Sequence, residues 1–186
     1  MLSRVDPTLN SDRNALLALW INAYNALTIH GILEVYPTPS IRRHTNPIGY
    51  NIWEHLKLLV GGTAYSLNDI EHNVLRKMNE PRIHFAIVCA STDCPRLLNQ
   101  AYLPANVESQ LEENARHFFA QDRNFLIEGT HRVHLNSILK WFAPDFGDTS
   151  ESQREFFAQF VEDSESRRAL TSPDTNFSYV PYDWSL

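Results

Sequence analysis

Cysteine is scarce in this sequence, and its scarcity excludes two kinds of small protein. Only two cysteines, Cys89 and Cys94, occur among 186 residues. Two thiols cannot form the framework of a disulfide-rich scaffold, nor can they alone supply a four-thiolate zinc site. The eight histidines contain neither a His-Glu-x-x-His pair nor another compact ligand spacing. We therefore expect no metal site within one local motif, and no cofactor.

Positive charge is also in short supply. The chain has 16 Lys and Arg against 22 Asp and Glu, which gives a formal net charge of −6, and it has no Lys/Arg-rich run. Such a sequence offers no basic track for a phosphate backbone. We do not expect nucleic acid as a partner. A small molecule or a peptide remains as a ligand class, and the oligomeric state is left open.

Long apolar runs are missing as well. No apolar stretch approaches the roughly 18 residues needed to cross a bilayer, and the segment 1–14 lacks the apolar core of a signal peptide. We therefore expect a soluble chain without a membrane span or an export address. What the chain does have is 43% hydrophobic residues, enough to bury one sizeable core. These figures predict a single domain over residues 1–186.

The order of apolar patterns predicts an α+β fold, because hairpins and helices follow one another without regular β-α alternation. Its centre is expected to be the helix 14–34, which is apolar over most of its circumference. Around it we predict a hairpin at Gly61 and Gly62, a helix over 66–78, a buried strand over 83–90, a short helix from Pro95, a helix over 105–121, a hairpin turning at Gly129, a helix from Asn136 or Ser137, and a helix carrying Phe156, Phe157, Phe160 and Val161.

Several polar residues fall on surfaces that are otherwise apolar. Asn22 and Asn25 lie on the central helix, and Glu71 falls inside the apolar stripe of the helix 66–78. His84 shares one face of the predicted strand with small residues, which leaves room for a partner, and Glu71 is the partner we favour. A buried polar group without a partner costs roughly 1–3 kcal/mol. We therefore expect these four residues to form one polar cluster.

Two interpretations of this cluster stay open. In a catalytic one, His84 is a general acid or base, Glu71 orients it, and an asparagine donates to a developing oxyanion. In a structural one, Glu71 and His84 form a satisfied buried pair, and Asn22 and Asn25 hold the irregular loop 37–52. By contrast, we expect Asp145 to brace a turn.

Cys94 stands directly before Pro95, and three interpretations apply to it. At a helix N-cap, free backbone N–H groups and the helix dipole would stabilise its thiolate and make it a nucleophile. It could instead be a small buried thiol. In an exported protein it could form a disulfide with Cys89, provided that the loop between them doubles back. A local dyad with His84 is not expected, because a straight strand would separate the two by roughly 20 Å.

Five stretches in order resemble a known family, the domain of unknown function 547. They are "LWINAYNALTIHGILEVYP", "SLNDIEHNVLR", "RIHFAIVCASTDCPRL", "SILKWFAPDFG" and "YDWSL", within residues 14–186. The family occurs in bacteria, plants and animals and implies no established activity. Its motifs match here at Asn22, Tyr24, Asn25, Glu71, Arg76, His84, Cys89, Cys94, Pro95 and Asp145.

Two departures from the family matter for function. Relatives usually have a longer region before residue 14, which implies a shortened N-terminus, and bacterial relatives are often exported, so the compartment stays open. Relatives also tend to have a small polar residue where this chain has Asp93. A carboxylate beside Cys94 opposes ionisation of its thiol.

The leading hypothesis for function is a thiol- or His/Glu-assisted hydrolase or acyl transferase that acts on a small molecule or a peptide. Its candidate catalytic residues are Cys94, His84 and Glu71, with Asn22 and Asn25 as polar or substrate-binding groups. The alternatives are a non-catalytic binding or scaffolding module with a structural polar cluster, and an exported domain stabilised by a Cys89–Cys94 disulfide. The aromatic tail is expected to seal the core.

Overall fold

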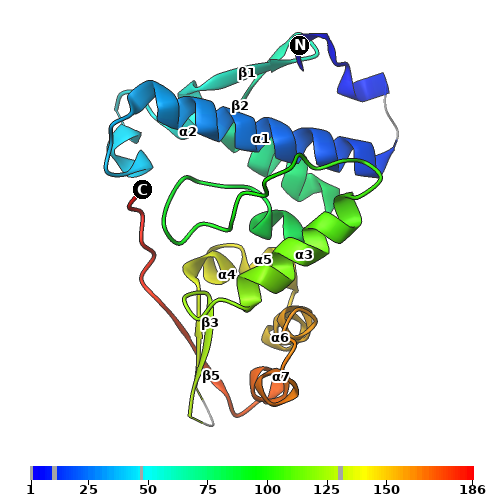
Figure 1. The fold of residues 1–186 in the computed structure, drawn as a ribbon, viewed down its shortest axis with the longest axis vertical. Coiled ribbons are helices and arrows are strands. Elements are labelled where there is room, and N and C mark those ends of the chain that lie inside the picture. The colour runs from blue at the N-terminus through cyan, green and yellow to red at the C-terminus, as the bar shows by residue number, and fades with distance from the viewer. Residues whose placement is uncertain (1, 10–11, 47, 130–131) are drawn as a thin grey trace.

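The predicted central helix is present and organises one end of the molecule. A computed structural model describes residues 2–9, 12–46, 48–129 and 132–186. In it, helix α1 (Arg13–Val35) begins after Asp12, whose side chain accepts a hydrogen bond from the Asn14 backbone N–H. Figure 1 shows α1 crossing this end beneath the hairpin of β1 (Lys57–Val60) and β2 (Thr63–Ser66), with the sheet and helices of the C-terminal half at the other end.

By length and composition alone, α1 could cross a membrane. An 18-residue window in it is apolar enough on average for a span, so the expectation that no apolar stretch reaches this length is wrong. Of that window, 56% is buried inside the protein. Core helices pass the same test, and α1 is therefore no clear membrane span.

The remaining elements confirm the α+β class. Hydrophobic side chains gather in two clusters, one around α1 and the first hairpin, the other around α3 and the three-stranded sheet. The first hairpin turns at Gly61 and Gly62, which both have positive φ angles as a two-residue turn requires. The elements are α2 (Ile52–His55), β1 (Lys57–Val60), β2 (Thr63–Ser66), α3 (Val107–Phe119), β3 (Phe125–Glu128), β4 (Arg132–Leu135), α4 (Ser137–Trp141), α5 (Ala143–Phe146), α6 (Ser150–Ala158), α7 (Ser164–Thr171) and β5 (Asn176–Tyr179).

The second sheet contains one strand that the sequence did not indicate. Strands β3 and β4 form the predicted antiparallel hairpin, and β5 from the C-terminal tail pairs with β4 in parallel. Of the hairpin turn, Gly129 is described, whereas Thr130 and His131 lie outside the described residues. The tail is thereby fixed at one point before it crosses to the other half of the molecule.

The predicted helix 66–78 is present in a widened form. It begins with the expected cap, in which Ser66 and Asp69 exchange hydrogen bonds between side chains and backbone. From Asp69 to Leu75 it is a π-helix, and Arg76–Met78 continue it as a 3-10 turn. A π-helical turn carries more residues per turn than an α-helix and often occurs at functional sites. Glu71 lies within it.

The predicted strand 83–90 is wrong. Pro81–Phe85 form a 3-10 helix, and residues 86–90 have no regular structure although most of them are buried. Buried backbone groups need hydrogen-bond partners, and here a side chain supplies them. Asn25 donates to the Ala86 carbonyl (3.0 Å) and accepts from the Val88 N–H (2.9 Å). The Asn25 amide thus satisfies two backbone groups that a neighbouring strand would satisfy in a sheet.

Two further expectations are corrected by the same region. Residues 95–106 contain no helix, so the predicted helix from Pro95 is wrong. Asn22 and Asn25 make no hydrogen bond to the described residues of the loop 37–52, 37–46 and 48–52, so the expectation that they hold this loop is wrong. Asn22 instead donates to the Tyr102 carbonyl (2.8 Å) and accepts from its N–H (2.9 Å). Both asparagines therefore fasten irregular segments of the chain to α1.

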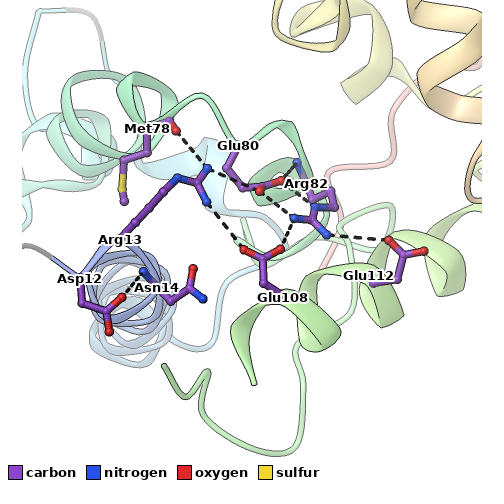
Figure 2. A network of polar contacts seen from close by, with 8 residues as sticks. All are labelled: Asp12, Arg13, Asn14, Met78, Glu80, Arg82, Glu108 and Glu112. Carbon is purple, nitrogen blue, oxygen red and sulfur yellow. Dashed lines mark hydrogen bonds and ion pairs between the residues drawn. The ribbon is translucent and has the colours of Figure 1, made fainter. Parts of the chain in front are cut away.

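An ion network fastens the segment 78–82 to α1 and α3. Figure 2 shows Arg13 and Arg82 between the carboxylates of Glu80 and Glu108. Glu80 is the most enclosed member, with a side chain only 8% exposed, and it accepts two hydrogen bonds from the Arg82 guanidinium, at 2.7 and 2.8 Å. Glu112 lies at the edge, 3.8 Å from Arg82 and 38% exposed.

This difference in burial predicts unequal effects on stability. Glu80→Ala should lower the free energy of unfolding by about 3 kcal/mol, because it leaves the half-buried Arg82 without its main partner. Glu112→Ala, the matched control at the edge of the network, should cost less than about 1 kcal/mol. Urea unfolding followed by circular dichroism measures both. Equal losses in the two variants would contradict this account.

Candidate functional site

One pocket gathers the predicted catalytic residues. It has a volume of about 220 Å³ and is lined from α1, α2, the π-helix, the segment 84–95, α4 and the C-terminal tail. Neither Asn22 nor Asn25 lines it. Among the described residues, no three His, Cys, Asp or Glu side chains are grouped so that they could hold a metal ion. The lining residues are Tyr24, Trp53, Asn68, Glu71, His72, His84, Ile87, Cys89, Cys94, Pro95, Ile138, Trp141, Phe142, Tyr182 and Trp184.

Glu71 pairs with a tyrosine, whereas its expected partner was His84. The Tyr24 hydroxyl from α1 donates to Glu71 Oε2 at 3.0 Å. Burial raises the pKa of the Glu71 carboxyl to about 7, although the hydrogen bond from Tyr24 and the charge of Arg76 act in the opposite direction. Burial and the nearby Glu71 also raise the pKa of Tyr24. Glu71 can therefore take up or release a proton near neutral pH.

The partner of His84 is Asp145, at 2.8 Å between Nε2 and Oδ2. The same carboxylate accepts two hydrogen bonds from Arg76, at 2.6 and 2.7 Å. Burial acts to raise the pKa of Asp145, but the hydrogen bonds from Arg76 and His84 outweigh it, so this pKa lies below its usual value. Asp145 therefore braces three segments rather than one turn, a role that its local sequence does not reveal.

His84 is uncharged at neutral pH. Burial lowers the pKa of its imidazole to about 4, and the hydrogen bond to Asp145 opposes this only in part. Its ring stacks on Phe142, with 4.0 Å between ring centroids, and its side chain is 1% exposed. Among the described residues, it makes no hydrogen bond to either cysteine. The straight strand from which a wide separation of His84 and Cys94 was expected is absent, and both residues line the same pocket.

Cys89 is the thiol that the site surrounds with hydrogen-bonding groups. Its Sγ lies 3.0 Å from Ser91 Oγ, 3.1 Å from the Tyr182 hydroxyl and 3.1 Å from Cys94 Sγ. The hydrogen bond with Cys94, followed by those with Ser91 and Tyr182, lowers the pKa of Cys89, although burial and Glu71 act against it. Ala90, with φ of 51°, makes the sharp turn between Cys89 and Ser91.

Cys94 has the opposite character. Its thiol is buried, and burial together with Cys89 raises its pKa well above the usual value. Because no helix follows Pro95, the N-cap and the dipole that would activate Cys94 are absent, and this basis for choosing it as the nucleophile is wrong. Both cysteines are free thiols in the structure. Cys94 Sγ accepts a hydrogen bond from the Cys89 backbone N–H at 2.7 Å.

The C-terminal tail contributes two aromatic walls that sequence reasoning did not assign to the site. Tyr182 packs against Trp141 and Trp184, with ring centroids 4.9 and 4.7 Å apart. The tail is held beside the cysteines because Asp93 accepts a hydrogen bond from the Asp183 N–H at 2.7 Å. Asp93, expected to oppose ionisation of Cys94, thus anchors the residue that follows Tyr182.

Comparison with known proteins gives one match. Residues 8–119 match a family described as a protein of unknown function, DUF547. No curated protein matches the chain. No solved structure matches it either. The matched region holds Glu71, His84 and both cysteines, whereas Asp145 and Tyr182 lie beyond its end.

Proposed function

The chain belongs to the DUF547 family of proteins of unknown function, and from this site we propose that it is a thiol-dependent hydrolase or acyl transferase acting on a small molecule or a peptide. One observation carries the proposal. A partly exposed thiol with three hydrogen-bonding neighbours at 3.0–3.1 Å shares its pocket with a half-buried carboxyl whose pKa is raised by burial to about 7. A nucleophile and a proton-exchanging group are the two parts that such chemistry needs.

Cys89 takes the role of nucleophile in this proposal, in place of Cys94. Its thiolate adds to the acyl carbon of the substrate, and the Ser91 and Tyr182 hydroxyls stabilise the thiolate before attack. The leaving group departs with a proton donated by the protonated Glu71, which leaves a thioester on Cys89. Water or an acceptor then loses its proton to Glu71 and attacks the thioester, which frees the thiol again. General acid–base assistance of this kind contributes about 10²–10⁴-fold to a rate.

His84 receives a positioning role. Its bond to Asp145, together with the two bonds from Arg76 to the same carboxylate, ties the segment 81–85 and α5 to the end of the helical element that carries Glu71. The ring is uncharged and stacked on Phe142, so it presents a rigid wall to the pocket. Asn25 positions Cys89 in a similar way through the backbone of Val88.

The test uses an activated ester as a general acyl donor. Mixed with p-nitrophenyl acetate, the protein should release a burst of p-nitrophenol and carry an acetyl group on Cys89, located by peptide mass spectrometry. Cys89→Ser should abolish the burst. Glu71→Gln should slow turnover by about 10²-fold, which is the lower end of the contribution of a general acid or base.

Two results would overturn the proposal. One is acetylation of Cys94 with Cys89 unmodified. The other is a chain that remains unacetylated although it is folded by circular dichroism, the outcome expected for a purely structural polar cluster. Cys94→Ser checks the assignment of the nucleophile, because the acetyl group should still be found on Cys89 in that variant.

A further inference from the structure

The two thiols form an asymmetric pair at the wall of the pocket. Both cysteines line the pocket, but Cys89 is partly exposed, whereas Cys94 is only 6% exposed. Their Sγ atoms are 3.1 Å apart. A disulfide bond is about 2.05 Å long, so an approach of about 1 Å by the sulfurs would join them. Cys89 is thus the thiol that is more open to a molecule from outside, and Cys94 lies within reach of Cys89.

We propose that Cys89 and Cys94 carry out thiol–disulfide exchange with small-molecule disulfides, with Cys89 as the attacking thiol and Cys94 as the resolving thiol. This activity goes beyond acyl transfer. It shares with the proposed function only the requirement that Cys89 is reactive, and it does not need Glu71. The pocket, at about 220 Å³, offers room for one half of a small disulfide beside Cys89.

The exchange is balanced in two steps. In the first, the Cys89 thiolate attacks one sulfur of a disulfide RSSR, the RS–SR bond breaks, and RS⁻ leaves and takes up from solvent the proton that Cys89 lost on ionising. In the second, Cys94 attacks the Cys89 sulfur of the mixed disulfide, the second RS⁻ leaves, and the proton of Cys94 passes to it. The result is a Cys89–Cys94 disulfide and two molecules of RSH, with the external disulfide as the oxidant.

The surroundings of the pair suit both steps. The Ser91 and Tyr182 hydroxyls lie against Cys89 Sγ, where they stabilise the attacking thiolate. The Cys89 N–H points at Cys94 Sγ from 2.7 Å, where it stabilises negative charge on the resolving sulfur as its proton leaves. Hydrogen bonds, first of all the one with Cys94, lower the pKa of Cys89, whereas burial raises the pKa of Cys94, and attack by the thiol with the lower pKa is favoured near neutral pH.

A consequence for the proposed function follows from the shared sulfur. In the bridged form, Cys89 has no thiolate with which to attack an acyl carbon. Oxidation by a small disulfide would therefore stop acyl transfer, and reduction would restore it.

The experiment mixes the reduced full chain with glutathione disulfide, quenches it with acid and blocks free thiols with N-ethylmaleimide before mass spectrometry. In the wild type, both thiols should disappear together into an internal disulfide, without accumulation of a glutathione adduct. Cys94→Ser should trap a mixed disulfide on Cys89. In Cys89→Ser, Cys94 should react with glutathione disulfide at least about tenfold more slowly than Cys89 reacts in Cys94→Ser. The reason is that each unit of thiol pKa changes the thiolate fraction tenfold.

Other outcomes count against the exchange. A glutathione adduct that persists on the wild type would show that Cys94 does not resolve it, and similar rates for the two single variants would remove the asymmetry. Because the wild-type measurement needs no variant, it stands even if a variant fails to fold. Glu71→Gln separates the two proposals, since it should still form the disulfide although its acyl transfer is slow. Disulfide formation in a wild type that accepts no acetyl group would leave the exchange standing and the acyl transferase refuted.

Discussion

Glu71→Gln should stabilise the protein at pH 8 by about 3 kcal/mol while it slows turnover. Burial raises the pKa of Glu71 to about 7 from an ordinary value of 4.5, and each unit of pKa shift corresponds to about 1.4 kcal/mol. Between those two pH values, the folded chain keeps a proton that the unfolded chain has lost. Stability therefore falls as the pH rises through this window, and above about pH 7 the whole cost is present. Glutamine stays neutral and can still accept the hydrogen bond from Tyr24.

The pH dependence isolates this effect from other groups. His84 works in the opposite sense, because burial lowers the pKa of His84 to about 4, and stability is lost as the pH falls below its ordinary value of 6.5. The informative quantity is thus the difference in unfolding free energy between Glu71→Gln and the wild type, measured in urea from pH 5 to pH 8. That difference should grow with pH. Glu151→Gln on the surface of α6 is the control and should change stability by less than about 0.5 kcal/mol throughout.

The sign of this difference also distinguishes the two classes of function. If the carboxylate serves only as a structural partner of Tyr24, its replacement should weaken the fold, so the variant would be less stable than the wild type at pH 8. A catalytic carboxyl in a desolvated site instead lowers the free energy of unfolding at a pH where it is ionised. Such a loss of stability is common at active sites. Loss of stability at pH 8 would therefore support the structural module and contradict the catalytic assignment.

Elements with strong local signals were predictable from the sequence. The apolar run of α1, the Gly61–Gly62 turn and the Ser66–Asp69 cap each act within a few residues, so the helix, the hairpin and the helix start follow from neighbouring side chains. The same holds for the amphipathic α3. The parallel strand β5 has no such signal, because its partner β4 is more than 40 residues earlier in the chain.

Part of the lining of the pocket was predictable, but the pairings of its residues were not. Glu71, His84 and both cysteines line one pocket, yet Glu71 binds Tyr24, 47 residues away, and His84 binds Asp145, 61 residues away. Side-chain periodicity places a residue on a face, but it does not say which distant segment covers that face. Tyr182, 93 residues from Cys89, was missed for the same reason.

The prediction of a strand over 83–90 failed for a different reason, which concerns the hydrogen bonds of the backbone. Its apolar run suits a buried strand, and the sequence gives no sign that an asparagine 61–63 residues earlier satisfies its backbone groups. Ala90 then adopts a positive φ angle, which alanine rarely does, and turns the chain away from any strand direction. The geometry of Cys89 therefore depends on Asn25.

Asn25→Leu should consequently be among the most damaging single changes in the molecule. It keeps the side-chain volume but leaves the Ala86 carbonyl and the Val88 N–H without partners in a buried place, at about 1–3 kcal/mol for each group. We expect a loss of about 2–5 kcal/mol in the free energy of unfolding, measured in urea. We also expect slower alkylation of Cys89 by iodoacetamide at pH 7, because a loosened segment no longer holds its sulfur against the Ser91 and Tyr182 hydroxyls.

Asn22→Leu separates the loss of stability from the loss of reactivity. Asn22 lies one turn earlier on α1 and makes the same pair of backbone hydrogen bonds, but to Tyr102, which does not line the pocket. This variant should also be destabilised, since two backbone groups lose their partner, yet the pH at which Cys89 reacts at half its maximal rate should stay where it is in the wild type. In Asn25→Leu that midpoint should move upward. Equal midpoints in the two variants would mean that Asn25 supports the fold without positioning the thiol.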